Sequence, residues 1–368
     1  MSSLGINKTI HKLLYIGMKY DYGIPARGEC YEYLNLFGTL EKMPEIHATH
    51  FPYDKILREV GKTAMNQRLR ETVRNEKPDI CFFVLFTDEF EKETIRSITD
   101  HSGATTLSWF ADDHWRFETF SKFWAPFFHW NITTDASSVE RYRQIGCPNV
   151  ILSQWGFNHH LPAPASDGYR YDVTFVGQVH SSRRRIVQQL AEQNISVNCW
   201  GKGWENGRIG TADMAKIFAE SRINLNFTAS SNTFTVKRFA KIIFSRRCDS
   251  TFHLNSPRRA ADEIQTLFQH RRPQIKGRNF EIPGHGGFLL TGYAEHLEDY
   301  YAPEKDIAVF RTPQELAEKI AFYLSHHEER ERIRESGHRR TRKEHTYEKR
   351  LQKIFQTVFS NSEDKAGQ

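Results

Sequence analysis

The stretch that decides the fold reads Tyr171-Asp-Val-Thr-Phe-Val-Gly-Gln178, and it is followed by the basic run Arg183-Arg-Arg185. β-branched and aromatic side chains dominate its first six residues, which is typical of a buried strand. The glycine that ends this run permits a tight turn. The residues after the turn have the composition of a helix that begins with arginines. Strand, turn and helix together predict one unit of a parallel α/β sheet.

The same alternation of strand and helix patterns extends over both halves of the chain. In the first half we expect strands at 12–18, 48–53, 79–86, 105–110, 130–134 and 149–153, with helices at 31–41, 55–76, 89–101 and 137–145. In the second half we expect strands at 171–176, 196–200, 223–227, 287–291 and 306–310, with helices at 182–193, 211–221 and 313–325. Residues 328–359 combine dense charge with spaced apolar residues, which predicts one or two long amphipathic helices.

A polar segment rich in proline and alanine, Leu161–Gly168, has the composition of a linker between the two halves. The length of 368 residues also fits two domains. We therefore predict an α/β protein with two Rossmann-like domains facing each other across a cleft. The first comprises residues 1–163 and the second residues 169–335, and a C-terminal amphipathic helix and tail follow at 336–368. Ligands of such open sheets bind at the carboxyl ends of the strands.

The positive charge of the chain is concentrated in one segment. Lysine and arginine number 51 against 45 acidic residues, a net charge of +6. Residues 231–272 contain nine basic and three acidic residues, so they account for 9 − 3 = +6 and the rest of the chain is neutral. The charge distribution therefore argues against a protein whose whole surface binds nucleic acid. It predicts a basic insertion at 231–272, either a solvated surface element or a docking patch for an anionic acceptor, partner or membrane surface.

Cysteine usage and hydropathy favour a cytoplasmic protein. The five cysteines are odd in number and lie about 50 or more residues apart, which excludes CxxC sites and argues against a disulfide framework. No apolar run approaches the roughly 18 residues of a membrane span. The apolar stretch Leu13–Met18 predicts a first strand rather than a signal peptide. Any contact with a membrane would then be peripheral.

Several signatures of nucleotide binding and catalysis are missing from the sequence. Without a GxGxxG fingerprint, a nicotinamide dehydrogenase has little support, and neither a GxSxG elbow nor an HExxH motif occurs. The triplet Gly61-Lys-Thr63 lacks the glycine that a P-loop needs at position 56, and it falls within a predicted helix.

Two turns in the second half carry residues suited to a ligand. Gly177 lets the backbone approach an anion closely, and the N–H groups of the following helix together with Arg183 suit a diphosphate. Trp200 and Gly201 open the run Trp200-Gly-Lys-Gly-Trp204. This run is either a stacking wall for a base or sugar or a tight turn with a buried tryptophan.

The most specific run is Lys276-Gly-Arg-Asn-Phe-Glu-Ile-Pro-Gly-His-Gly-Gly-Phe-Leu-Leu-Thr291. It resembles the donor-binding segment of two-domain glycosyltransferases of the GT-B fold. More narrowly, it resembles the family that includes the spore-maturation glycosyltransferase-like proteins. The segments 175–177 with Arg183, 224–226, 310–316 and 344–347 fit the same pattern. The resemblance covers about residues 170–358, and it is mainly architectural over residues 12–160.

The resemblance implies that the second domain binds a nucleoside-diphosphate sugar as donor substrate, without a cofactor or metal, and that the first domain binds the acceptor. Glu281 would accept hydrogen bonds from the ribose hydroxyls, while Arg183, Lys276 and Arg278 would face the diphosphate. The other residues expected at the donor site are Gly177, Trp200, Gly201, Asn226, Phe280, Gly286 and Gly287. No Asp-x-Asp metal clamp occurs in the chain. The larger retaining relatives carry another glutamate where this chain has Pro273, so the resemblance to retaining enzymes is incomplete at this position.

The first domain offers a second polar cluster. Asp112, Asp113 and His114 follow the strand predicted at 105–110 and would project into the cleft. One carboxylate could serve as general base for the acceptor hydroxyl or orient the substrates, whereas an aspartate just before a helix is also the usual N-cap. The first loop, residues 17–23 with Arg27, would meet the donor phosphates or the acceptor, or form a plain β–α turn.

Three functions remain open from the sequence alone. The first is metal-independent and retaining transfer of a sugar to a carbohydrate, lipid-linked or protein acceptor. The second is a non-catalytic nucleotide-sugar-binding or assembly protein on the same fold. The third is a DNA-modifying sugar transferase that uses the insertion at 231–272. The adjacent His159 and His160 have no carboxylate or cysteine at metal-ligand spacing, and we interpret them as hinge or surface residues.

Overall fold

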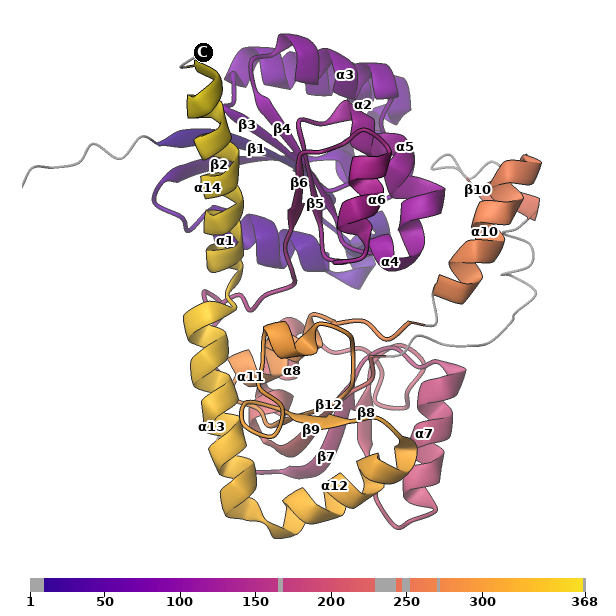
Figure 1. The fold of residues 1–368 in the computed structure, drawn as a ribbon, viewed down its shortest axis with the longest axis vertical. Coiled ribbons are helices and arrows are strands. Elements are labelled where there is room, and N and C mark those ends of the chain that lie inside the picture. Colours follow the sequence, from indigo (N-terminus) through magenta and orange to yellow (C-terminus); the bar gives the residue numbers. More distant parts are fainter. Residues whose placement is uncertain (1–9, 165–167, 229–242, 247–251, 270–271, 367–368) are drawn as a thin grey trace, which may run out of the picture. The chain divides into compact units, whose positions relative to one another are not determined.

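The computed structural model describes residues 10–164, 168–228, 243–246, 252–269 and 272–366. This part of the chain divides into two compact units, each built on a parallel sheet (Figure 1). Unit 1 contains the described residues of Met1–Gln154, Ala240–Thr266 and Arg350–Gln368, and unit 2 contains those of Trp155–Phe239 and Leu267–Lys349. The chain therefore returns to unit 1 twice. The sequence instead assigned the first returning segment to the second domain and the last to a separate tail.

The sheet of unit 1 contains six strands among the described residues, in the order β2-β1-β3-β4-β5-β6. Their bounds are His11–Gly17 (β1), Ile46–Pro52 (β2), Ile80–Phe83 (β3), Thr105–Phe110 (β4), Trp130–Thr133 (β5) and Val150–Leu152 (β6), and all pairings are parallel. From β1 the chain continues toward one edge of the sheet, and from β3 toward the other. Connections that diverge in this way leave a crevice at the carboxyl ends of the two strands.

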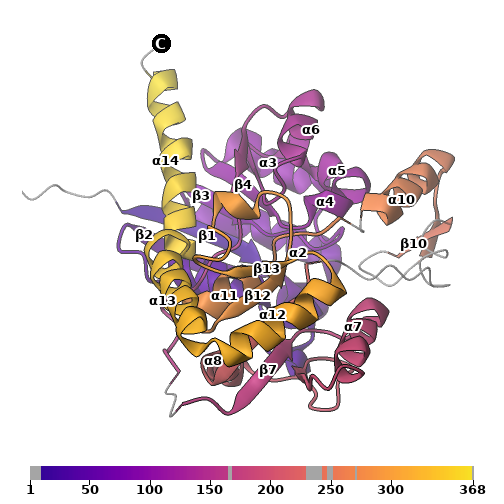
Figure 2. The same ribbon diagram turned by 60° about the horizontal axis from the view of Figure 1, so that its bottom comes forward.

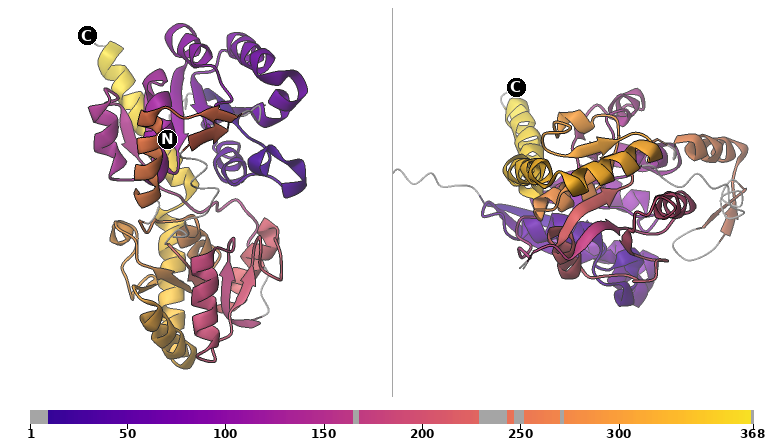
Figure 3. Two further views of the ribbon diagram at one scale, coloured as in Figure 1. Left: turned by 90° about the vertical axis from the view of Figure 1, so that its right-hand side faces the viewer. Right: turned by 90° about the horizontal axis from the view of Figure 1, so that it is seen from below.

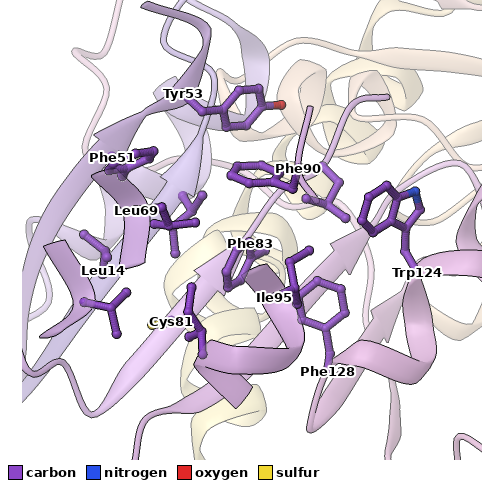
Figure 4. Close-up of a cluster of buried hydrophobic side chains, with 14 of the residues drawn as sticks. Leu14, Phe51, Tyr53, Leu69, Cys81, Phe83, Phe90, Ile95, Trp124 and Phe128 are labelled. Carbon is purple, nitrogen blue, oxygen red and sulfur yellow. The ribbon is translucent and has the colours of Figure 1, made fainter. Parts of the chain in front are cut away.

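Helices cover this sheet because side chains alternate between its faces along each strand. Leu14 and Ile16 of β1 join the apolar core beneath the long helix α2, while Tyr15 between them lies against Phe37 at a ring distance of 5.4 Å. Figure 4 shows this apolar core of unit 1, in which Phe83 of β3 lies among side chains from α2 and α3. The helices and helical turns of unit 1 include Asp21–Gly23, Pro25–Arg27, Tyr33–Phe37, α1 (Gly38–Leu40), α2 (Tyr53–Glu76), α3 (Lys92–His101), α4 (Asp113–Arg116), Phe117–Ser121, α5 (Lys122–Trp124), Ala125–Phe127 and α6 (Ser138–Gln144).

The sheet of unit 2 contains five described strands in the order β13-β12-β9-β7-β8, again with parallel pairings. Their bounds are Tyr171–Val176 (β7), Asn198–Trp200 (β8), Ser221–Asn226 (β9), Leu289–Gly292 (β12) and Ala308–Phe310 (β13). The direction of winding changes between β7 and β9, because β8 lies on one side of β7 and β9 on the other. The carboxyl ends of β7 and β9 therefore form the crevice of this unit.

Two apolar cores flank the sheet of unit 2. Phe288 and Leu290 belong to the core beneath α7 (Ser181–Ala191) and α12 (Pro313–Ser325), and Leu289 between them belongs to the core beneath α8 (Thr211–Ala219) and α11 (Arg278–Gly284). Figure 2 shows α12 lying across this sheet with α13 (His327–Glu344) at its end. The last helix, α14 (Tyr347–Ala366), begins in unit 2 and continues into unit 1.

The strand and helix predictions are confirmed at most positions. The strands at 105–110 and 171–176 and the helix at 313–325 occur with the predicted bounds. The prediction for the run 276–291 was wrong in one respect, since a helix, α11, precedes the strand where the sequence indicated only a glycine-rich turn. Pro283 and Gly284 weaken the helix signal locally, but α11 is buried from Asn279 to Gly284, and its packing overrides this weak propensity.

The basic insertion predicted at 231–272 falls largely outside the described residues. Its described part consists of β10 (Phe244–Arg246), which pairs antiparallel with β11 (Phe252–Leu254), and of α10 (Pro257–Gln269) (Figure 3). The Lys122 ammonium lies 3.0 Å from the Asp262 carboxylate of α10. Both side chains are mostly buried, so this ion pair fixes the helix to unit 1. The proposed docking role of the insertion stays a prediction.

None of the helices in the described part of the chain combines the length and the apolar character needed to cross a bilayer.

Candidate functional site

The first candidate site lies at the carboxyl end of β7 in unit 2. Gly177 follows this strand, and its N–H donates to the Trp200 carbonyl at 2.8 Å. Gly201 has a φ of +129°, and a Cβ atom there would lie 2.3 Å from the Gly177 carbonyl oxygen. Trp204 donates its indole N–H to the same oxygen at 2.9 Å. The two loops therefore approach so closely that position 201 requires glycine.

Arg183 lies in the first turn of α7, next to this pair of loops. Its Nη1 donates to the Gln178 carbonyl at 2.7 Å, which directs the guanidinium back toward the end of β7. Burial, and after it the positive charge of Arg278, lowers the pKa of Arg183 to about 10. Its buried Nε–H has no hydrogen-bond partner among the described residues. The Arg183 guanidinium therefore has an N–H group that could donate a hydrogen bond to a ligand, and a second cation, Arg278, lies near it.

Arg278, the first residue of α11, provides that second cation. Its Nε donates to the Val176 carbonyl at the end of β7 at 3.4 Å, and its Nη1 forms an ion pair with the Glu281 carboxylate. The Glu281 side chain is only 7% exposed, whereas that of Arg278 is 27% exposed. The structure thus brings together four predicted residues: Gly177, Arg183, Arg278 and Glu281.

A buried network of amides positions the segment before α11. Asn226, at the end of β9, donates to Asn279 Oδ1 at 3.1 Å and to Thr291 Oγ1 at 3.0 Å. The N–H of Lys276 donates to the same Asn279 oxygen at 2.8 Å. Asn226 is 3% exposed, so it holds this segment in place from within the core. Asn279 was missed by the sequence analysis, because an asparagine inside a recognised run gives no separate signal of burial.

The other predicted donor-site residues pack in different parts of unit 2, and the backbone of Trp200 belongs to the loop pair at the end of β7. Phe280 is fully buried and packs against Tyr301 at a ring distance of 5.7 Å. Gly286 and Gly287 precede β12, so they lie at its amino end and not at the carboxyl ends where Arg278 lies. Trp200 is half-buried with its ring edge-on to Tyr171, 5.2 Å away, which agrees with the tight-turn alternative. These positions shape unit 2 around the arginine pair.

The second candidate site is a cavity of about 240 Å³ at the carboxyl ends of β1, β3 and β4 in unit 1. The residues that line it come from three strand ends, from the loop and first helical residues after β1, and from the helical turns after β4: Met18, Asp21, Tyr22, Cys30, Tyr31, Glu32, Val84, Leu85, Phe86, Trp109, Phe110, Ala111, Asp112, Arg116, Phe120 and Ser121. The first loop of the sequence analysis therefore does contribute to a cavity, through Asp21 and Tyr22.

Three acidic groups and one cation gather in this cavity. Burial, together with the charges of Asp112 and Asp21, raises the pKa of Glu32 to about 7, and Arg116 partly opposes this shift. The Arg116 guanidinium lies 4.0 Å from the centre of the Phe120 ring and donates to the Phe86 carbonyl at 2.5 Å. Sequence analysis missed Glu32 because it falls in a helical pattern where a charged residue usually marks a solvated face.

Of the predicted cluster Asp112, Asp113 and His114, the cavity contains only Asp112. Asp113 is fully buried and accepts a hydrogen bond from the Tyr142 hydroxyl at 2.7 Å. Burial raises the pKa of Asp113 to about 6, which hydrogen bonds from neighbouring hydroxyls partly offset. His114 is 4% exposed. Asp112 occupies the N-cap position of α4, but its side chain makes no capping hydrogen bond, so its carboxylate remains available to the cavity.

Comparisons with known proteins agree with this architecture. A model of the family described as glycosyl transferase-like matches residues 182–241 and 240–356. HepE of Anabaena, solved in complex with UDP-glucose, is 11% identical, with a TM-score of 0.60 over 95% of this chain and 100% of that chain. The sucrose-phosphate synthase of Thermosynechococcus elongatus is 10% identical, with a TM-score of 0.59 over the same shares. A search of curated protein sequences gives no significant match.

The two parallel-sheet units and these structural neighbours define the class of protein: the chain has the GT-B fold. The match of the glycosyl transferase-like family model to residues 182–356, which include most of unit 2, then supports a glycosyltransferase. Its narrower likeness to the spore-maturation proteins stays a prediction.

Proposed function

We propose that the protein transfers a sugar from a nucleoside-diphosphate sugar, whose diphosphate binds at the carboxyl end of β7. The pair Arg183 and Arg278 carries this proposal, because both guanidinium groups donate to backbone carbonyls at the end of β7 or just after it, and because burial, and after it the charge of Arg278, lowers the pKa of Arg183. Holding two like charges together costs free energy, and a bound dianion offsets that cost. Arg183 also lies in the first turn of an eleven-residue helix, whose N–H groups add positive potential.

The same groups would promote the chemical step. When the bond between sugar and diphosphate breaks, negative charge develops on the departing nucleoside diphosphate. Fixed cations stabilise that charge, and removing one such donor typically costs about 10²–10³ in rate. Since side chains supply this charge, we propose that transfer needs no metal ion. UDP-sugars are the first donors to test, because the HepE structure of similar fold contains UDP-glucose.

We place the acceptor in the cavity of unit 1. The carboxylates of Asp21, Glu32 and Asp112 suit the hydroxyl groups of a carbohydrate, a glycolipid precursor or a protein side chain. A carboxyl group with a pKa of about 7, as in Glu32, can accept a proton from an acceptor hydroxyl at neutral pH. We propose retention of the anomeric configuration by resemblance, and NMR of the product would distinguish retention from inversion.

Nucleotide titrations test the donor site. Calorimetry with UDP, GDP, CDP, ADP and their sugars should find one nucleotide that saturates the wild-type protein. Arg183→Ala should weaken its binding at least tenfold, because a charge-assisted donor is lost. Arg184→Ala removes an exposed arginine one residue further along α7 and should change the affinity less than twofold. If no nucleotide binds, or if both variants bind like wild type, the diphosphate assignment fails.

Turnover separates an enzyme from a binding protein. Slow release of nucleoside diphosphate from the bound donor, measured without acceptor, supports transfer. Glu32→Gln should lower the rate with acceptor at neutral pH while leaving donor affinity unchanged. Saturable donor binding with no release across a panel of acceptors would instead favour the non-catalytic alternative.

A further inference from the structure

A group of three potential metal ligands lies in unit 2, and none of the three belongs to the residues of the proposed transfer reaction. His159 Nε2 lies 3.0 Å from Glu348 Oε2, and His160 Nε2 lies 3.7 Å from the same oxygen. One ligand atom from each residue falls within 4.8 Å of the other two. Among the described residues, this is the one group of three such side chains that converge in this way.

Backbone hydrogen bonds hold the two segments that supply these ligands. The Phe157 N–H donates to the His345 carbonyl at 2.9 Å, and the Tyr347 N–H donates to the Phe157 carbonyl at 3.0 Å. Gly156 makes this approach possible, since a Cβ atom there would lie 2.9 Å from the Tyr347 nitrogen. The ligand positions are therefore fixed before any ion binds, which lowers the cost of assembling a site.

The chemistry of the three groups suits a transition metal ion. Two imidazoles and one carboxylate form a ligand set typical of zinc, with a fourth position left for water. Zinc–nitrogen bonds of about 2.0–2.1 Å in tetrahedral geometry place neighbouring donor atoms roughly 3.3 Å apart. The observed separations of 3.0 and 3.7 Å lie on either side of this value. The imidazole rings lie 4.0 Å apart, so two protonated histidines would repel each other here.

We propose that His159, His160 and Glu348 bind one divalent transition metal ion of the zinc class. The bound ion would connect the segment just before the linker 161–168 to the start of α14. Both ligand segments lie close in sequence to the points where the chain passes between the units, at Gln154 and at Lys349. The ion would therefore stabilise unit 2 near the two points where the chain passes between the units. This proposal concerns metal binding, and it does not depend on the proposed transfer reaction.

Metal titrations of untagged full-length protein, first stripped with a chelator, test this site. Wild type should bind one Zn²⁺ per chain by calorimetry, and Co²⁺ should give a visible absorption band typical of nitrogen and oxygen ligands. Since partners outside the first coordination sphere alone are worth about 10–100-fold in affinity, Glu348→Gln should weaken Zn²⁺ binding at least tenfold. His160→Ala changes a loop residue and provides a second variant if Glu348→Gln folds poorly.

The matched control is the double variant His326→Ala/His327→Ala, which removes an exposed pair of adjacent histidines outside any such group. It should bind Zn²⁺ like wild type and show the same increase in melting temperature on addition of the metal. Equal affinity in wild type and both site variants, or an equal loss in the control, would show only adventitious surface binding and overturn the proposal. Failure of wild type to bind Zn²⁺ saturably would do the same.

Discussion

Replacing Arg278 with alanine should destabilise unit 2 through the carboxylate that it leaves behind. Glu281 is 7% exposed and its ion pair is with Arg278. Breaking a buried pair by removing one partner costs about 3–5 kcal/mol. Because Arg278 is itself 27% exposed, water screens part of the interaction, and we expect the lower end of this range, about 3 kcal/mol. Adding Glu281→Gln removes the stranded charge and should restore about half of the loss.

Hydrogen exchange measures this effect where it arises. A chain with two units is not expected to unfold in a single step, so one melting curve would mix their responses. The amides of β7, residues 171–176, report on the strand whose end contacts Arg278, and those of β4, residues 105–110, provide an internal control in unit 1. A loss of about 3 kcal/mol corresponds to roughly hundredfold faster exchange.

The order of the variants decides the question. In Arg278→Ala, exchange should accelerate in β7 and stay unchanged in β4, and the double variant Arg278→Ala/Glu281→Gln should fall between the single variant and wild type. If the double variant exchanges as fast as Arg278→Ala or faster, the stranded carboxylate is not the cause and the reasoning is refuted. Arg183 has no acidic partner in the part of the chain that the structure describes, which is why Arg183→Ala is the cleaner probe of nucleotide binding.

Two buried titratable groups should give stability a pH dependence of opposite sign. Burial, and after it the charge of Arg278, lowers the pKa of His285 to about 4, below the usual 6.5. The stability that neutral His285 contributes to the folded state is therefore fully present above pH 6.5 and is lost as the pH falls toward 4. Wild type should therefore lose about 3 kcal/mol more than His285→Gln between pH 7 and pH 4, measured by hydrogen exchange of the β12 amides, residues 289–292, and equal losses would contradict this. Burial raises the pKa of Asp113 from 3.8 to about 6, so its contribution is present below pH 3.8 and is lost as the pH rises through 6. Wild type should lose about 2 kcal/mol relative to Asp113→Asn between pH 4 and pH 7, whereas a pH-independent difference would contradict the assignment.

The strands were predictable because their signal is local. The segments 105–110 and 171–176 are short and apolar and have clear boundaries, and each needs only a neighbouring strand to satisfy its backbone. Helix α11 was not predictable in this way, since its sequence contains proline and glycine and its stability comes from burial. The return of the chain to unit 1 after Lys349 depends on packing between residues far apart in sequence, which composition does not encode.

The candidate sites likewise contain residues that the sequence predicted and residues that it did not. The resemblance grouped Arg183, Arg278 and Glu281, and the structure places them together at the end of one strand. Between Asp112 and Asp113 the sequence offers no distinction, because the phase of a helical turn decides which neighbour faces the cavity. Glu348 lies far along the chain from the histidines that it contacts, so spacing alone concealed this group.

The two arginines of unit 2 are not equivalent, and their difference bears on the proposed reaction. Glu281 already neutralises much of the charge of Arg278, and the Val176 carbonyl accepts a further hydrogen bond from it. Arg183 contacts a carbonyl but no carboxylate, and one of its buried N–H groups has no partner among the described residues. Under the proposed function, Arg183 would supply most of the uncompensated charge for the diphosphate, while Arg278 would hold Glu281 and the start of α11 in position. A ribose hydroxyl that donates to Glu281 would weaken the ion pair between Glu281 and Arg278. The positive charge of Arg278 would then be less neutralised and could attract the diphosphate more strongly, so binding of the ribose and binding of the diphosphate would reinforce each other.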